Sequence, residues 1–141
     1  MSESTSSAVV LLQPRITLAA ARRVIAAAQR EAELQGWNIA VAVVDPAGEL
    51  VALEKADHAI GISPTVASGK ARTAALLQAP SGLFEGFINA GQPSFLSTPG
   101  VTALEGGVPL LHQGVVIGAV GVSGAHGEND SRVAEVAAAA L

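Results

Sequence analysis

The sequence predicts a single α+β domain in which helices pack on a mainly antiparallel sheet of about five strands. Two stretches predict hairpins. In residues 37–55, apolar runs flank the turn Asp45-Pro46-Ala47-Gly48, and in residues 106–124 they flank Gln113-Gly114. Helical patterns precede, separate and follow these hairpins. Because hairpin-connected strands are antiparallel, a doubly wound parallel sheet is not expected.

The first helix is predicted after Thr17, which is a good N-cap residue. Apolar side chains then recur at intervals of three and four residues over about 18 residues. Gly36 can end this helix, because glycine readily adopts the left-handed conformation of a C-terminal cap. The charged face of the helix is most simply a solvated face.

The middle of the chain predicts two further helices. Ser63 is expected to cap the first, with Pro64 in its first position, and Pro80 to end it. Ser81 is expected to cap a short second helix. Residues 90–100 are rich in glycine, proline and serine, so a loop is expected there.

The glycine-rich hairpin is the most distinctive stretch of the chain. Gly118, Gly121 and Gly124 recur every third residue of an apolar, β-branched run, so they alternate between the faces of the strand. Glycine weakens a strand unless something approaches its backbone closely. Two interpretations follow: tight packing of helices on the strand, or a bare floor that admits a flat ligand or a partner's backbone.

Two short segments flank this hairpin. Residues 101–105 are expected to form a short strand before it. A last helix is expected from Ser131 to Ala140, with Asn129 or Asp130 as its cap.

Composition excludes several classes of function. The 141 residues suffice for one domain, which we place at residues 14–141 after a disordered tail at 1–13. A net charge of −4 without a basic stripe argues against nucleic-acid binding. No run approaches the roughly 20 apolar residues of a membrane span, and no signal peptide is recognised, so the cytoplasm is expected. The absence of cysteine excludes disulfides and thiolate chemistry.

Known catalytic motifs are absent. Neither Gly-x-Gly-x-x-Gly nor Walker A occurs, and Ala125 stands where a nucleophile elbow around Ser123 would need glycine. The three histidines, His58, His112 and His126, lack the spacing of a helix-borne metal site, so no metal site is expected.

A small set of polar residues remains as candidates for chemistry. His58 follows Asp57, and His126 precedes Glu128 and Asp130, all in loops at strand ends. Such histidines suit acid–base work or ligand donation, although each is by itself more simply a surface residue. Lys70 lies among alanine and glycine on a predicted helix. It is either a solvated lysine, an anchor for a carboxylate or phosphate, or one half of a buried ion pair with Asp57 or Glu54.

Several motifs together resemble the GlcG/HbpS-like family, whose domain also occurs at the C-terminal end of some PduO-type adenosyltransferases. The hairpin at residues 44–51 matches, as do Lys70-Ala71-x-Thr73-Ala74, Gly106-Gly107-Val108-Pro109 and residues 117–124. The resemblance covers residues 18–141.

The chain departs from the family pattern in places. The family usually has Arg-Met-Asp-Gly-Ala where this chain has Lys55-Ala56-Asp57-His58-Ala59, and Asp130 is usually followed by Glu instead of Ser131. The resemblance implies an α-β-α arrangement and homo-oligomers such as dimers, tetramers or octamers. Some members bind haem, others bind corrinoid-related proteins, and others are associated with small-acid catabolism.

Three functions are therefore considered, and whether the protein is an enzyme is left open. The first is haem binding, for which His58 and His126 are the expected ligands and Gly106 and Gly107 line the site. The second is an isomerase, hydratase or lyase of a catabolic pathway that acts on an organic acid or carbonyl compound by proton transfer. Its candidate residues are Lys70, His58, Asp57, His126 and Asp130. The third is a non-catalytic oligomeric scaffold.

Two structural expectations follow from these hypotheses. Lys70 should point into a cleft at the strand ends that it shares with Asp57 and the Gly106-Gly107 turn. The protein should form a homo-oligomer, partly through Ala- and Gly-rich surfaces, because half of the chain is apolar and only 14% is charged.

Overall fold

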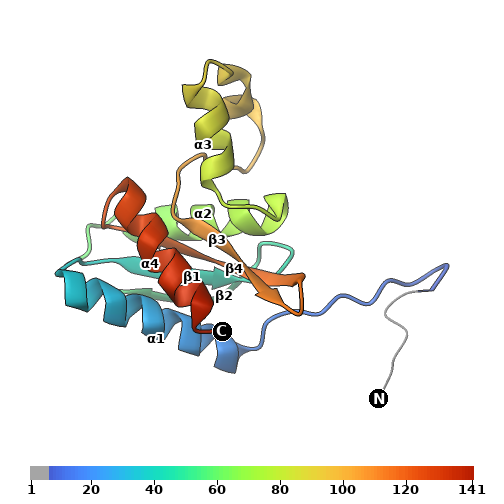
Figure 1. Ribbon diagram of the computed structural model, residues 1–141, viewed down its shortest axis with the longest axis horizontal. Helices are drawn as coiled ribbons and strands as arrows, with labels where there is room; N and C mark the ends of the chain where they lie inside the picture. The colour runs from blue at the N-terminus through green and yellow to red at the C-terminus, as the bar shows by residue number, and fades with distance from the viewer. Residues whose placement is uncertain (1–6) are drawn as a thin grey trace.

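One antiparallel sheet forms the centre of the computed structural model, which describes residues 7–141 (Figure 1). Its four strands lie in the order β2–β1–β4–β3. Their bounds are Ala40–Val44 for β1, Leu50–Lys55 for β2, Gly107–His112 for β3 and Val115–Ser123 for β4. The predicted α+β class and both predicted hairpins are confirmed, with four strands in place of about five.

The strand expected at residues 101–105 does not form. The backbone N–H of Thr102 donates to the Thr73 hydroxyl over 2.8 Å, and the carbonyl of Leu104 accepts from the Ser81 hydroxyl over 2.6 Å. Side chains of the preceding helical region thus use backbone groups that a strand would need for pairing.

Helices cover both faces of the sheet (Figure 1). Helices α1 (Leu18–Gln35) and α4 (Gly127–Ala139) pack on one face, and α2 (Ser63–Leu77) packs on the other. The expectations for α1 are confirmed, since the Thr17 hydroxyl accepts from the Ala20 N–H and Gly36 ends the helix at φ 78°. Helix α3 (Gly82–Asn89) and the 3₁₀ helix η1 (Pro93–Ser97) stand apart from these layers.

The two faces of the sheet carry side chains of different size. The face toward α1 and α4 is made of larger side chains, namely Val41, Val43, Leu110, Val120 and Val122. The face toward α2 is made of Ala40, Ala42, Val44 and Ala119, against alanines of the helix. A Cβ at Gly121 would meet the Ala67 carbonyl and the Ala71 amide of α2. At Gly121 the packing interpretation is therefore correct, because α2 fills the space offered to a flat ligand.

The side-chain caps predicted for the other three helices do not form. Helix α2 begins at Ser63 itself with Ile62 as N-cap, and the buried Ser63 hydroxyl has no hydrogen-bond partner among residues 7–141. Ser81 occupies the predicted N-cap position of α3, but it makes no side-chain cap, because its hydroxyl bonds Leu104 and Gly107 instead. Helix α4 begins at Gly127, four residues earlier than predicted, with His126 as N-cap.

The β3–β4 hairpin turns where the sequence predicts. Gln113 and Gly114 both have positive φ, 51° and 78°, as a two-residue turn requires when it must follow the twist of its strands. Of the predicted disordered tail, residues 1–6 lie outside the described part, and residues 7–13 are exposed. Among residues 7–141, none of the helices combines the length and apolarity that crossing a membrane requires.

Candidate functional site

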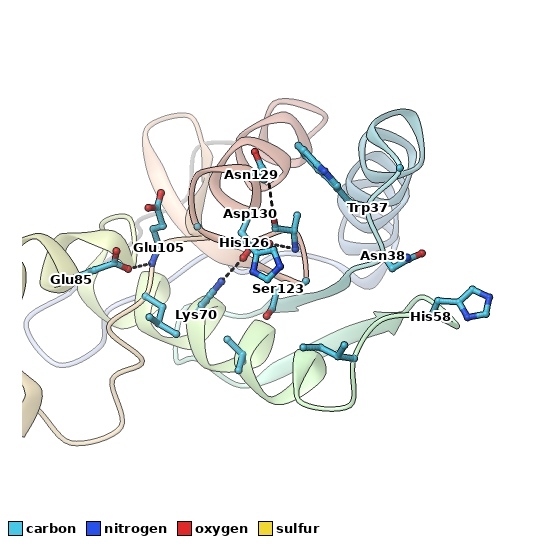
Figure 2. Close-up of a pocket in the computed structure, with 17 residues that line it drawn as sticks. Trp37, Asn38, His58, Lys70, Glu85, Glu105, Ser123, His126, Asn129 and Asp130 are labelled. Carbon is cyan, nitrogen blue, oxygen red and sulfur yellow. Dashed lines mark hydrogen bonds and ion pairs between the residues drawn. The ribbon is translucent and has the colours of Figure 1, made fainter.

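A buried ion pair joins the two helical layers at the end of the sheet. The Lys70 ammonium lies 3.0 Å from Asp130 Oδ2 and donates to the Val122 carbonyl over 2.9 Å (Figure 2). Lys70 and Asp130 are each only 3% exposed. Lys70 comes from α2 and Asp130 from the first turn of α4, so the lysine side chain reaches past the end of β4 to the opposite layer.

The other oxygen of Asp130 holds the loop that follows β4. Asp130 Oδ1 accepts from the Ala125 N–H over 2.8 Å. Both carboxylate oxygens therefore have donors, which is the condition for keeping a buried charge. The carboxylate also lies near the N-terminus of α4, where the helix dipole favours negative charge.

Glycine before β3 makes room for this pair. Gly106 has φ 124°, and a Cβ there would lie 2.9 Å from Lys70 Nζ, 2.9 Å from Asp130 Cβ and 2.8 Å from the Val122 carbonyl oxygen. A Cβ at Gly107 would overlap the Lys70 carbonyl. These two glycines therefore let the lysine pass between α2 and the start of β3.

A cavity of about 720 Å³ opens above the ion pair. Parts of five segments line it: the end of α1 with the residues before β1, the loop before α2 with its first turns, α3, the segment before β3, and the end of β4 with the start of α4. The labelled lining residues in Figure 2 are Trp37, Asn38, His58, Lys70, Glu85, Glu105, Ser123, His126, Asn129 and Asp130. The cavity lies at strand ends, and its volume is typical of small-molecule sites.

The cavity brings together four of the five residues that the sequence predicted as catalytic candidates. Lys70, Asp130, His58 and His126 line it, although the His58 ring is directed away from the Lys70–Asp130 pair in Figure 2. Asp57 is exposed and does not line the cavity, so a cleft shared by Lys70 and Asp57 is wrong. The proposed ion-pair partners Asp57 and Glu54 are also wrong, because the buried partner of Lys70 is Asp130.

Two acidic residues of the cavity wall were not predicted. Glu85 Oε1 accepts from the backbone N–H of Glu105 over 2.8 Å, and Glu105 Oε1 accepts from the Ser131 hydroxyl over 2.7 Å. The sequence feature that could have indicated Glu105 is its position directly before the Gly106-Gly107 turn. With Lys70 and Asp130 neutralising each other, these two carboxylates give the cavity an acidic side.

Four further polar or aromatic residues that were not predicted also line the cavity: Trp37, Asn38, Ser123 and Asn129. Ser123 is the last residue of β4 and is 8% exposed. It lies on the α2 face of the strand, because Ala119 and Gly121 face α2 and side chains alternate along a strand. No group of three or more histidine, aspartate or glutamate side chains within residues 7–141 is arranged to hold a metal ion.

Comparisons with known proteins identify the family. A family model described as "Haem degrading protein HbpS-like" matches residues 16–139. Protein GlcG of Escherichia coli strain K12 is 44% identical over 103 residues, which are 73% of this chain and 77% of GlcG.

Solved structures of similar fold agree with this assignment. A double mutant of Streptomyces reticuli HbpS is 31% identical, with a TM-score of 0.86 over 100% of this chain and 97% of that chain. A PduOC:heme complex is 24% identical, with a TM-score of 0.81 over 90% of this chain and 95% of that chain, and at this identity it supports the fold alone. The family model and the GlcG match show that this chain belongs to the HbpS-like family.

Proposed function

We propose that this protein binds haem in the cavity at the strand ends. The observation that carries the proposal is His126, which lines a cavity of about 720 Å³ from the N-cap position of α4. The HbpS-like family, whose model is described as a haem degrading protein, supplies the ligand class. Haem, when bound, supplies a redox-active iron whose behaviour depends on its axial ligand and surroundings.

The available donors suit this ligand and limit its axial partner. Cysteine and tyrosine are absent from the sequence, and the only methionine is Met1. His126 and His58 both line the cavity, whereas His112 is an exposed residue at the end of β3 outside it. We rank His126 above His58, because the His58 ring is directed away from the floor of the cavity (Figure 2).

Haemin titration followed by absorption spectroscopy tests the proposal. The wild-type protein should shift the Soret band of haemin at one equivalent per chain, and His126→Ala should lose most of this shift. His112→Ala removes an imidazole outside the cavity and is the matched control. A Soret shift that survives removal of both His58 and His126 rules out the ligand assignment, and a wild-type protein without any shift rules out haem binding.

A second candidate function is proton transfer on a small carbonyl compound. Lys70 favours it, because its ammonium has three N–H donors and the two hydrogen bonds described above leave one for a ligand. Lys70 would polarise a carbonyl oxygen, and His126 would remove a proton from the adjacent hydroxyl-bearing carbon to give an enediolate. His126 would return this proton to the former carbonyl carbon while the hydroxyl proton passes to the former carbonyl oxygen, so the isomerised product has the same atoms as the substrate.

Deuterium exchange distinguishes this second candidate from haem binding. With dihydroxyacetone as probe in D₂O, proton NMR should show faster loss of the carbon-bound protons than in buffer alone. His126→Ala should abolish the acceleration, and His112→Ala should not. Exchange at the rate of buffer would leave no support for proton transfer on this probe class.

We also propose that the chain assembles as a homo-oligomer. Half of the residues are apolar, and many large apolar side chains are exposed in a single chain, among them Val9, Leu11, Leu34 and Leu96. Light scattering at micromolar concentration tests this. A mass of 14.1 kDa that persists as concentration rises would contradict it.

A further inference from the structure

Residues 82–100, which contain α3 and η1, form a lobe that stands away from the sheet and its helices (Figure 1). We call this segment the Phe lobe, because it holds all three phenylalanines of the chain, Phe84, Phe87 and Phe95. The rings pack on one another, with centroid distances of 4.8, 4.8 and 6.0 Å. Neither α3 nor η1 contains a buried residue.

The Phe lobe leaves much of its apolar surface uncovered. Leu83 and Leu96 are 41% and 68% exposed, and the three phenylalanines are only partly buried by one another. Aromatic side chains each offer a large apolar area, and segments this small do not normally bury enough of it alone. A surface of this kind is typical of a contact with another protein.

The charge of the Phe lobe indicates which protein makes that contact. Residues 86–104 contain no Asp, Glu, Lys or Arg, although the chain carries a net charge of −4. The only charged residue within the lobe is Glu85, and its Oε1 accepts a hydrogen bond from Glu105 of the domain body. Two copies of an acidic chain repel each other elsewhere, but they can meet through this uncharged surface without facing like charges.

We propose that the Phe lobe binds the same lobe of a second copy of this chain across a two-fold axis. An isologous contact needs a surface that complements itself, and an uncharged aromatic and aliphatic surface meets that requirement. The proposal rests on the homo-oligomer proposed above and names its interface. It differs from the Ala- and Gly-rich surfaces expected from the sequence, of which the alanines of α2 already pack on the sheet.

The proposed interface adjoins the cavity. Glu85 belongs to the lobe, and Leu104 and Glu105 lie at its base, and all three line the cavity wall. Pairing of the lobes would therefore hold one wall of the cavity in place. Assembly would then influence what the cavity binds, although the second copy contributes no residue to the cavity.

A matched pair of substitutions tests the proposal by light scattering at micromolar concentration. Leu96→Asp places a charge in the lobe, at a residue whose 68% exposure means that the single chain does not need it for folding. Leu34→Asp makes the same change at a residue of α1 that is 76% exposed. Far-ultraviolet circular dichroism should show both variants folded.

We expect wild type and Leu34→Asp to have the same oligomeric mass and Leu96→Asp to have a smaller one, with its apparent dissociation constant raised at least tenfold. A monomeric wild type overturns both the homo-oligomer and the interface, and would leave the lobe to a different protein partner. An oligomeric wild type that Leu96→Asp does not weaken overturns the lobe interface alone. Loss of assembly in Leu34→Asp but not in Leu96→Asp overturns it in favour of α1.

Discussion

Lys70 and Asp130 form an ion pair of 3.0 Å although their helices, α2 and α4, lie on opposite faces of the sheet. The contact is possible because β4 ends at Ser123 and Gly106 has no side chain, which leaves a passage for the lysine at the sheet's end. The pair thus fastens the two helical layers together and forms part of the cavity lining.

Breaking this ion pair should strongly destabilise the protein. Lys70→Met or Asp130→Asn leaves its partner unpaired in a site where each side chain is only 4% exposed. Each change should cost about 3–5 kcal/mol in the free energy of unfolding, measured with urea, and the double variant should cost less than the sum. The control is Arg132→Met, which breaks an ion pair to Glu31 whose arginine side chain is 62% exposed, and which should cost less than about 1 kcal/mol. Equal costs for the buried and exposed pairs would contradict the structural role of Lys70.

Gly106→Ala should also destabilise the fold. The new Cβ would meet the Lys70 ammonium and the Val122 carbonyl at a residue with φ 124°, so strain and overpacking add together. We expect a loss of about 2–4 kcal/mol in urea unfolding. Gly61→Ala is the control, because Gly61 has neither a positive φ nor an atom within 4 Å of its added Cβ. Equal stability of Gly106→Ala and Gly61→Ala would contradict the conclusion that Lys70 needs the space left by Gly106.

Ser81→Ala should weaken the attachment of the Phe lobe. The Ser81 hydroxyl donates to the Leu104 carbonyl and accepts from the Gly107 N–H, so its removal leaves two backbone groups unpaired. The expected cost is about 1–3 kcal/mol, with faster hydrogen exchange at the Gly107 amide. Ser94→Ala, an exposed serine of the lobe, should change stability by less than about 0.5 kcal/mol. Unchanged exchange at Gly107 would show that this hydrogen bond contributes little.

Neutralising the acidic wall should strengthen haemin binding. The carboxylates of Glu85 and Glu105 line the cavity and would repel the propionates of haem. Glu85→Gln with Glu105→Gln should therefore raise haemin affinity about two- to fivefold at low salt, and less at high salt. The control is Glu33→Gln on the exposed face of α1. Weaker binding in the double variant would indicate that these carboxylates contact the ligand favourably.

Much of this fold follows from local sequence patterns. Thr17 and Gly36 mark both ends of α1, and Gln113-Gly114 marks the β3–β4 turn, because these signals depend on backbone conformation within a few residues. The side-chain cap predicted at Ser81 fails because this serine has distant partners. The Ser81 hydroxyl bonds residues 23 and 26 positions away, and such partners leave no local pattern.

The candidate site also combines features that the sequence predicts with features that only packing determines. The sequence by itself determined which residues could do chemistry, since Lys70 is isolated among small residues and histidine supplies the axial donors considered. Only the tertiary structure decided that Lys70 meets Asp130 instead of Asp57, and that Glu85 and Glu105 join the cavity. Lys70 and Asp130 are 60 residues apart in the chain, and their contact depends on how α2 and α4 pack against the sheet. Local propensity constrains each element, but the partners of a buried charge are set by packing between elements that the sequence pattern does not locate in space.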